Sequence, residues 1–142
     1  MNKKITTTQI QALAQAAIAV KKFSYSPYSH FKVGAAVLTE DGKIYAGTNI
    51  ENASYGLTLC AERNAMFKAV SEGYKHFTAL ALCTDPVPGQ PFGTPCGACL
   101  QVMTEFMKPD TPLFLISIDK KGKQTLYKKK LKNFMPYSFT DF

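Results

Sequence analysis

The stretch FKVGAAVLTEDGKIYAGTNIE, residues 31–51, contains the signals for the first two strands of the fold. Residues 31–38 and 43–50 both have the apolar and β-branched character of strands. Asp41 and Gly42 lie between them, and this dipeptide supplies the positive backbone angles that a tight hairpin turn favours. The stretch therefore predicts two neighbouring strands joined by a turn.

The segment before this hairpin predicts an amphipathic helix. Its apolar residues recur at helical spacing, and two Thr-to-Gln pairs offer a capping box: Thr6 with Gln9, or Thr8 with Gln11. Glutamines interrupt its apolar run, so an amphipathic helix fits the segment better than a secretion signal does. No run reaches the roughly 20 apolar residues of a membrane span, so we expect a soluble, cytoplasmic protein.

Helices and strands alternate after the hairpin. Helices are predicted from Cys60 to about Val70 and from Pro95 to about Pro109, separated by a short buried strand and a loop rich in proline and glycine. The remaining predicted strands cover residues 77–83, 113–118 and 124–127. This alternation predicts one layered α/β domain over residues 1–142.

The formal charge of +7 comes from 17 basic and 10 acidic residues, and lysines concentrate within residues 121–132. Such a cluster can bind nucleic acid. It lacks the arginines and stacking aromatics of nucleic-acid sites, so we interpret it as a solvated face near a sheet edge or helix end.

Three of the four cysteines lie at the starts of predicted helices. Cys60 opens one helix, and the stretch TPCGACLQ puts Cys96 and Cys99 in the first turn of another. Helix N-termini favour thiolates, so these three side chains could converge on one zinc ion. Cys83 is expected to be a buried thiol rather than a fourth ligand. His30 and His76 are interpreted as ordinary structural or surface histidines.

Glu62 lies two residues after Cys60, within the same helical turn. A zinc site with three protein ligands leaves a position for water, and a nearby carboxylate can move the proton of that water. The combination CAE (60–62) with PCGAC (95–99) matches the three-cysteine form of the zinc deaminase signature.

The chain resembles the small, homotetrameric type of cytidine deaminase. The stretches that carry the resemblance are YSPYSHFKVGAAVL (25–38), GTNIENASYGLTLCAERNA (47–65), TPCGACLQVMTEF (94–106) and, more faintly, FMPYSF (134–139). The resemblance implies a three-layer α/β/α fold with a mixed sheet of about five strands. It also implies hydrolytic deamination of cytidine and deoxycytidine in pyrimidine salvage, with one zinc ion per subunit.

The resemblance implies that Cys60, Cys96 and Cys99 hold the zinc and that Glu62 shuttles the proton. Three thiolates exceed the charge of Zn²⁺ by one, which opposes acidification of the water. Arg63 is the expected donor that withdraws negative charge from a ligating sulfur.

Other roles implied by the resemblance concern the substrate. Asn49 and Glu51 would bind the sugar hydroxyls, and Phe31 would pack beside the pyrimidine. The amide of Ala61 would bind the carbonyl of the base, and the carbonyl of Thr94 would face its exocyclic amine.

Phe139 resembles an aromatic residue that reaches into the active site of a neighbouring subunit. The implied partners are therefore a nucleoside and other copies of this chain, with no nucleic acid and no membrane. The chain departs from the family pattern at Leu100, where arginine is usual. We expect this difference to alter stability or subunit contacts rather than the chemistry.

Three alternatives stay open on the sequence alone. A cytosine-bearing antibiotic such as blasticidin could be the substrate, although the Asn49 and Glu51 pair suits a free ribose. Deamination within RNA or DNA would suit the positive charge, but those enzymes usually have histidine in place of Cys60. A non-catalytic zinc module would require a fourth protein ligand.

Overall fold

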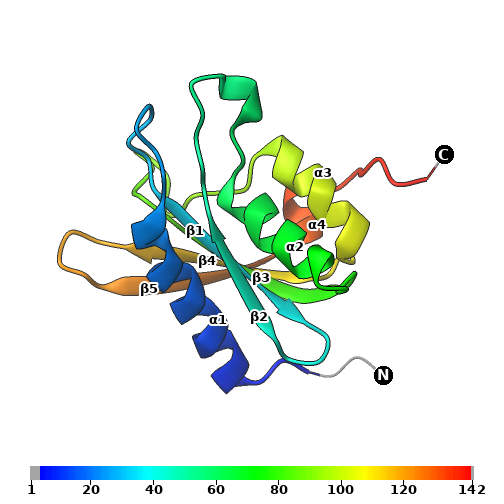
Figure 1. Ribbon diagram of the computed structural model, residues 1–142. Coiled ribbons are helices and arrows are strands. Elements are labelled where there is room, and N and C mark those ends of the chain that lie inside the picture. Colours follow the sequence, from blue (N-terminus) through cyan, green and yellow to red (C-terminus); the bar gives the residue numbers. More distant parts are fainter. Residues whose placement is uncertain (1–3, 142) are drawn as a thin grey trace.

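The computed structural model describes residues 4–141, so both ends of the predicted domain, residues 1–3 and 142, lie outside the described part. Five strands form one sheet in the order β2-β1-β3-β4-β5, and helices lie on both of its faces (Figure 1). The elements are α1 (Thr7–Val20), η1 (Lys21–Phe23), β1 (Val33–Thr39), β2 (Ile44–Thr48), η2 (Tyr55–Leu57), α2 (Ala61–Ser71), β3 (Phe77–Thr84), α3 (Gly97–Phe106), β4 (Pro112–Ile118), β5 (Gln124–Lys130) and α4 (Leu131–Phe134).

Strand directions place the starts of α2 and α3 at the same edge of the sheet. β1 pairs antiparallel with both β2 and β3, so β2 and β3 run in the same direction and end at one edge. α2 is the next α-helix after β2, and α3 follows β3 and forms the crossover to the parallel strand β4. Because β1 begins at this edge, the segment before it, which includes Phe31, also arrives there.

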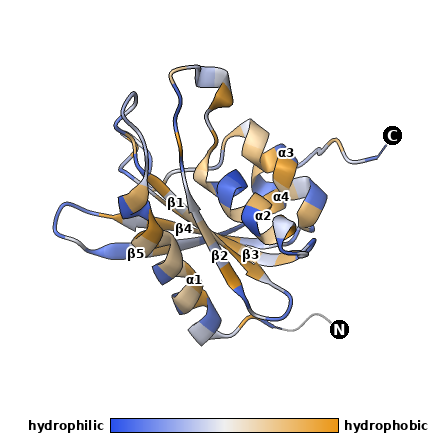
Figure 2. Ribbon diagram, in the orientation of Figure 1, coloured by the Kyte–Doolittle hydropathy of each residue, from blue (hydrophilic) through white to orange (hydrophobic). Residues whose placement is uncertain are grey.

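Alternating side chains along the central strands divide the core between two faces. Ala35 and Val37 of β1 pack in a cluster with α2 and α3, whereas Ala36 and Leu38 pack in a second cluster with α1. Figure 2 shows the apolar colours on the central strands and the hydrophilic colours at the turn between β4 and β5. The predicted three-layer arrangement and mixed sheet are confirmed.

Two glycines allow helices to approach the sheet closely. A Cβ atom at Gly34 would lie 2.1 Å from the carbonyl oxygen of Ala17 in α1. A Cβ atom at Gly47 would lie 2.6 Å from the amide nitrogen of Ala65 in α2. Any side chain at these positions would push its helix away from the sheet.

The predicted elements exist, with local differences. The hairpin is confirmed, but only Gly42 adopts a positive φ, of 88°, because four residues separate the strands. Thr6 and Gln9 form the capping box of α1. α3 begins at Gly97 rather than at Pro95, because Cys96 is its N-cap.

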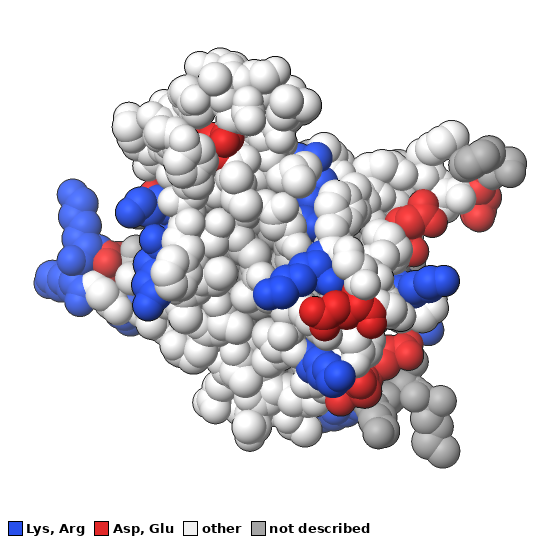
Figure 3. All heavy atoms as spheres, in the orientation of Figure 1, with Lys and Arg blue, Asp and Glu red and all other residues white. Residues whose placement is uncertain are grey.

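Most of the lysine-rich segment, residues 121–132, forms β5, which is an exposed strand at the edge of the sheet. This agrees with the interpretation of the lysine cluster as a solvated face near a sheet edge. Lys130 and Lys132 both pair with Asp110, at 3.2 and 2.8 Å. Figure 3 shows basic side chains projecting at the end of the molecule where β4 turns into β5. Within residues 4–141, no helix has the length and apolar character needed to cross a membrane.

Candidate active site

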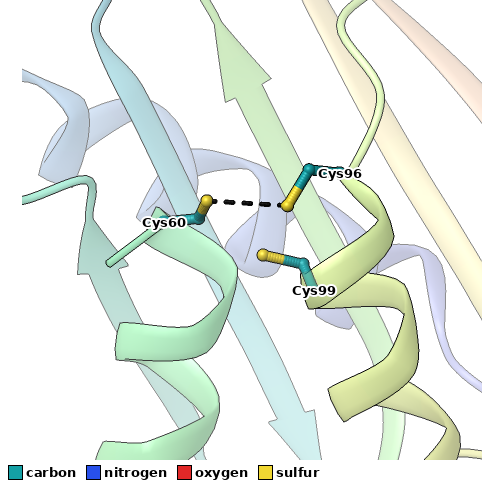
Figure 4. A group of neighbouring side chains, drawn as sticks. All are labelled: Cys60, Cys96 and Cys99. Atoms are coloured by element: carbon teal, nitrogen blue, oxygen red, sulfur yellow. Dashed lines mark hydrogen bonds between the residues drawn. The ribbon is translucent and has the colours of Figure 1, made fainter. Parts of the chain in front are cut away.

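Three cysteine sulfurs meet where α2 and α3 begin. Cys60 is the N-cap of α2, Cys96 is the N-cap of α3, and Cys99 lies in the first turn of α3. Their sulfurs point toward one another across the gap between the helices (Figure 4). The Cys60 and Cys96 sulfurs are 3.7 Å apart, and all three lie within 4.8 Å of one another. The structure thus brings together the three predicted ligands.

The electrostatic environment favours negative charge at Cys60. Neither N-cap side chain accepts a capping hydrogen bond from a backbone amide of its helix, and both lie at a helix N-terminus, where the helix dipole favours negative charge. The Arg63 guanidinium donates to the Cys60 sulfur at 3.4 Å. A hydrogen bond from Cys99 and the contact with Arg63 lower the pKa of Cys60 to about 5. The same hydrogen bond, in which the Cys99 thiol donates to the Cys60 sulfur, raises the pKa of Cys99.

The donor set fits a zinc ion. Tetrahedral zinc with Zn–S bonds of about 2.3 Å places its sulfurs about 3.8 Å apart, close to the separation of Cys60 and Cys96. Binding the cation would deprotonate all three thiols. Among residues 4–141 the three cysteines are the one group of His, Cys, Asp and Glu side chains close enough to hold a metal. Cys83 is buried in the cluster under α1, as predicted.

Glu62 is the buried carboxyl group beside this cluster. It lies in the first turn of α2, directly after Ala61, and only 4% of its surface is exposed. Burial raises the pKa of Glu62 to about 7, and the negative charge of Cys60 adds to the shift. Such a group can both accept and donate a proton near neutral pH.

Backbone hydrogen bonds connect the segment of Asn49 and Glu51 to the segment that leads into Cys60. Ile50, between them, forms a bridge with Leu59 in which both amides and both carbonyls pair, at 2.9 and 3.1 Å. Leu59 directly precedes Cys60. The bridge therefore fixes the predicted sugar-binding pair relative to Cys60, the first predicted zinc ligand.

The predicted base-binding residues come to the same edge of the sheet. The Asn49 side chain donates to the carbonyl of Phe31 at 2.8 Å. Lys32, the next residue, accepts a hydrogen bond at its carbonyl from the Asp85 amide and donates its own amide to the Asp85 carboxylate. Asp85 begins the loop that leads to Thr94. Thr94 is exposed and lies two residues before Cys96.

Two serines that the sequence alone does not single out hold the polar pair in place. The Ser24 hydroxyl donates to the Asn49 side-chain oxygen at 2.5 Å. The Ser29 hydroxyl donates to a Glu51 carboxylate oxygen at 2.5 Å. Both serines lie within residues 23–31, an aromatic and serine-rich segment whose polar residues carry no spacing that identifies these contacts.

Residues 7–114 match the family model described as the cytidine and deoxycytidylate deaminase zinc-binding region. The match covers all three cysteines, Glu62 and the polar pair. The chain belongs to the cytidine and deoxycytidylate deaminase family. Zinc is accordingly the metal of the three-cysteine cluster.

Individual members of this deaminase family are similar over most of the chain. A cytidine deaminase of Halalkalibacterium halodurans is 52% identical over 108 residues, which cover 74% of this chain and 77% of that protein. A probable cytidine deaminase of Dictyostelium discoideum is 46% identical over 79% of this chain and 80% of its own length. The crystal structure of cytidine deaminase from Burkholderia pseudomallei is 40% identical, with a TM-score of 0.82 over 95% of this chain and all of that chain.

Residues 100 and 101 follow Cys99, the last predicted zinc ligand of this deaminase. Leu100 is almost fully buried in the core cluster between the sheet and the helices α2 and α3, where an arginine would need a charged partner. The Gln101 side chain donates to the backbone carbonyl of Phe139 at 2.9 Å. The C-terminal tail is therefore held at the middle of α3, and 68% of the Phe139 surface is exposed in the single chain.

Proposed function

We propose that the protein catalyses zinc-dependent hydrolytic deamination of cytidine and deoxycytidine to uridine and deoxyuridine, with release of ammonia, in pyrimidine salvage. The observation that carries the proposal is the convergence of three cysteine sulfurs beside the buried Glu62, in a member of the deaminase family. The relatives named as cytidine deaminases support the nucleoside substrate. Residues 1–142 would act as one catalytic domain.

Cys60, Cys96 and Cys99 would hold the zinc ion. When bound, zinc supplies a Lewis acid that makes a water molecule nucleophilic near neutral pH. Glu62 would take a proton from this water and deliver it to N3 of the cytosine ring as the water oxygen bonds to C4. It would then pass the second proton of the water to the exocyclic amine. The bond from C4 to that nitrogen breaks, ammonia leaves, and the oxygen stays as the uracil carbonyl.

Glu62 suits this role because a single position must accept and donate in turn. Its burial keeps bulk water from delivering the protons, and its place in the first turn of α2, two residues after Cys60, limits the distance that each proton travels. A pKa of about 7 leaves both protonation states populated.

The base would lie between Phe31 and the starts of the two helices. The Ala61 amide is the first of α2 and has no acceptor within its own helix, so it can donate to the C2 carbonyl of the pyrimidine. The Thr94 carbonyl would accept from the exocyclic amine. The attachment of Lys32 to Asp85 supports this arrangement, because it ties Phe31 to the loop that carries Thr94.

Asn49 and Glu51 offer complementary groups to one sugar hydroxyl. The Asn49 side-chain oxygen already accepts from the Ser24 hydroxyl and from the Val33 amide. Of the two N–H groups on its side-chain nitrogen, one donates to the Phe31 carbonyl, and the other is left to donate to the substrate. Glu51 is a carboxylate that can only accept. A hydroxyl group can accept from Asn49 and donate to Glu51 at the same time, which supports a ribose or deoxyribose with a free hydroxyl.

The surroundings of Glu51 support a nucleoside rather than a nucleotide. The hollow beside it is lined by Tyr28, Ser29, Glu51, Tyr55 and Thr58 and holds no positive charge among these residues. The hydrogen bond from Ser29 lowers the pKa of Glu51, so the group is anionic at neutral pH. A phosphate placed there would be repelled.

Arg63 would neutralise the excess charge of the three thiolates, as its contact with the Cys60 sulfur supports. We expect Arg63→Ala to weaken zinc binding by about 10- to 100-fold, because it removes the charged donor to a ligand. Competition with a colorimetric chelator measures this affinity. Lys68→Ala, at an exposed position of the same helix, is the control. Unchanged zinc affinity together with unchanged turnover would show that Arg63 has no part in the site.

We further infer a cytoplasmic homotetramer in which Phe139 completes a neighbouring active site. The exposed aromatic side chains of Tyr25, Tyr28 and Tyr55 beside the polar pair support burial by another copy. The exposed Phe139 ring, on a tail held by Gln101, supports a contact beyond its own chain.

A panel of substrates tests the proposed activity. Cytidine, deoxycytidine, cytidine 5′-monophosphate, blasticidin S and single-stranded DNA are each offered to the zinc-loaded protein, and loss of cytosine absorbance is followed together with ammonia release. We expect turnover of both nucleosides and little with the other compounds. A preference for the nucleotide, the antibiotic or the polymer would contradict the proposal.

A further inference from the structure

Glu51 is held by three donors from one turn of the chain. The amides of Tyr28 and Ser29 donate to one carboxylate oxygen at 3.0 and 3.1 Å, and the Ser29 hydroxyl donates to the other at 2.5 Å. Both oxygens are therefore engaged, and the carboxylate plane is fixed. The backbone amide of Glu51 is also fixed, since it donates to the Tyr25 carbonyl at 2.9 Å.

Ser29 makes a second contact that leads toward the base. Its hydroxyl oxygen accepts from the Phe31 amide at 3.0 Å while its proton goes to Glu51. One hydroxyl thus connects the proposed sugar-binding carboxylate to the backbone of the residue proposed to pack on the pyrimidine. A serine hydroxyl can do this because it donates and accepts at once.

The turn that presents Ser29 is conformationally strained. His30, between Ser29 and Phe31, has a φ of 56°, the one positive φ of a residue other than glycine among residues 4–141. Its amide donates to the Ser26 carbonyl at 3.0 Å, which closes the turn. A left-handed histidine is maintained only when the surrounding contacts require it, and such strain concentrates at functional sites.

We propose that Ser29 is a positioning residue that aligns Glu51 and Phe31, so that the sugar and the base of the nucleoside are bound in one fixed relative orientation. This inference rests on the proposed function, because it gives Glu51 and Phe31 their roles at the substrate. Without the Ser29 hydroxyl, one Glu51 oxygen loses its hydrogen bond and can rotate into the adjoining hollow. The Phe31 amide loses its acceptor in the same step.

The test compares Ser29→Thr with Ser29→Val, which have nearly the same shape and differ in the hydroxyl. We expect the threonine variant to keep the wild-type KM for cytidine. The valine variant should raise KM by about tenfold, the effect of one charge-assisted hydrogen bond. Its zinc content and its kcat should change little, because Ser29 hydrogen-bonds Glu51 and Phe31 rather than the three cysteines or Glu62. Ser71→Ala, which removes an exposed serine hydroxyl at the end of α2, is the control.

Two further measurements separate positioning from a general loss of structure. If Ser29 acts through Glu51, the double variant Ser29→Val with Glu51→Gln should have nearly the same KM as Glu51→Gln alone. If Glu51 binds a 2′- or 3′-hydroxyl, the valine variant should also lose much less with 2′,3′-dideoxycytidine, which lacks these two hydroxyls. Equal KM values for the valine and threonine variants, or additive effects in the double variant, would overturn the inference. A wild-type protein that does not deaminate cytidine would instead refute the proposed function.

Discussion

Glu62→Gln is expected to keep one zinc ion per chain and to lower kcat for cytidine by about 10²- to 10⁴-fold, the contribution of a positioned acid and base. Glutamine has nearly the shape of glutamate, so it fits the buried position without disturbing the three sulfurs. It cannot take a proton from water or return one to the departing amine. KM should change much less than kcat, because no group proposed to bind the sugar is altered.

Zinc analysis and an absorbance assay on the same sample measure both parts of this prediction. Glu105→Gln, the same change at an exposed position of α3, should leave zinc content and kcat at the wild-type values. A zinc-loaded Glu62→Gln variant with nearly normal kcat would remove Glu62 from the chemistry. Loss of zinc from this variant would show that the carboxyl group supports the metal instead.

Cys96→Ala should abolish both zinc retention and activity. Two thiolates would remain of three, and neither the described histidines nor Cys83 lies within reach to replace the missing ligand. Cys96 is exposed at the N-cap of α3, so its removal leaves no cavity in the core. The loss would therefore report metal binding rather than packing.

Dialysis against a chelator followed by elemental analysis measures the zinc that each variant retains. Cys83→Ala is the matched control, since it is the same substitution at a cysteine on the opposite face of the sheet. This variant should keep full zinc occupancy. Thermal unfolding gives an independent readout: a chelator should lower Tm of the wild type and of Cys83→Ala, and leave Tm of Cys96→Ala unchanged. Full zinc occupancy in Cys96→Ala would contradict the ligand assignment.

The three cysteines could be proposed as a group from the sequence because each lies near the start of a predicted helix. Cys60 and Glu62 open a run of helix formers, and a proline precedes Cys96. The distance between the two segments could not be predicted in this way. They meet because β2 and β3 both lie antiparallel to β1, which brings the starts of the following helices to one edge. That pairing depends on contacts between residues far apart in the sequence.

The hydrogen bonds that hold Asn49 and Glu51 in place could not be predicted from the sequence for a different reason. Ser24 and Ser29 contact Asn49 and Glu51 across 25 and 22 residues of sequence. A serine in a loop has many local uses, so its residue type alone does not reveal such a partner. The left-handed backbone of His30, next to Ser29, is uncommon for any residue other than glycine, and the identity of the residue as histidine does not predict it.

Zinc titration of the metal-free protein tests the central claim most directly, with uridine and ammonia measured at each addition. The three-cysteine site predicts no deamination without metal, a linear rise in the rate with added zinc, and a plateau at one zinc ion per chain. Turnover of cytidine by the metal-free protein, or a fully loaded site that produces neither uridine nor ammonia, would contradict the account.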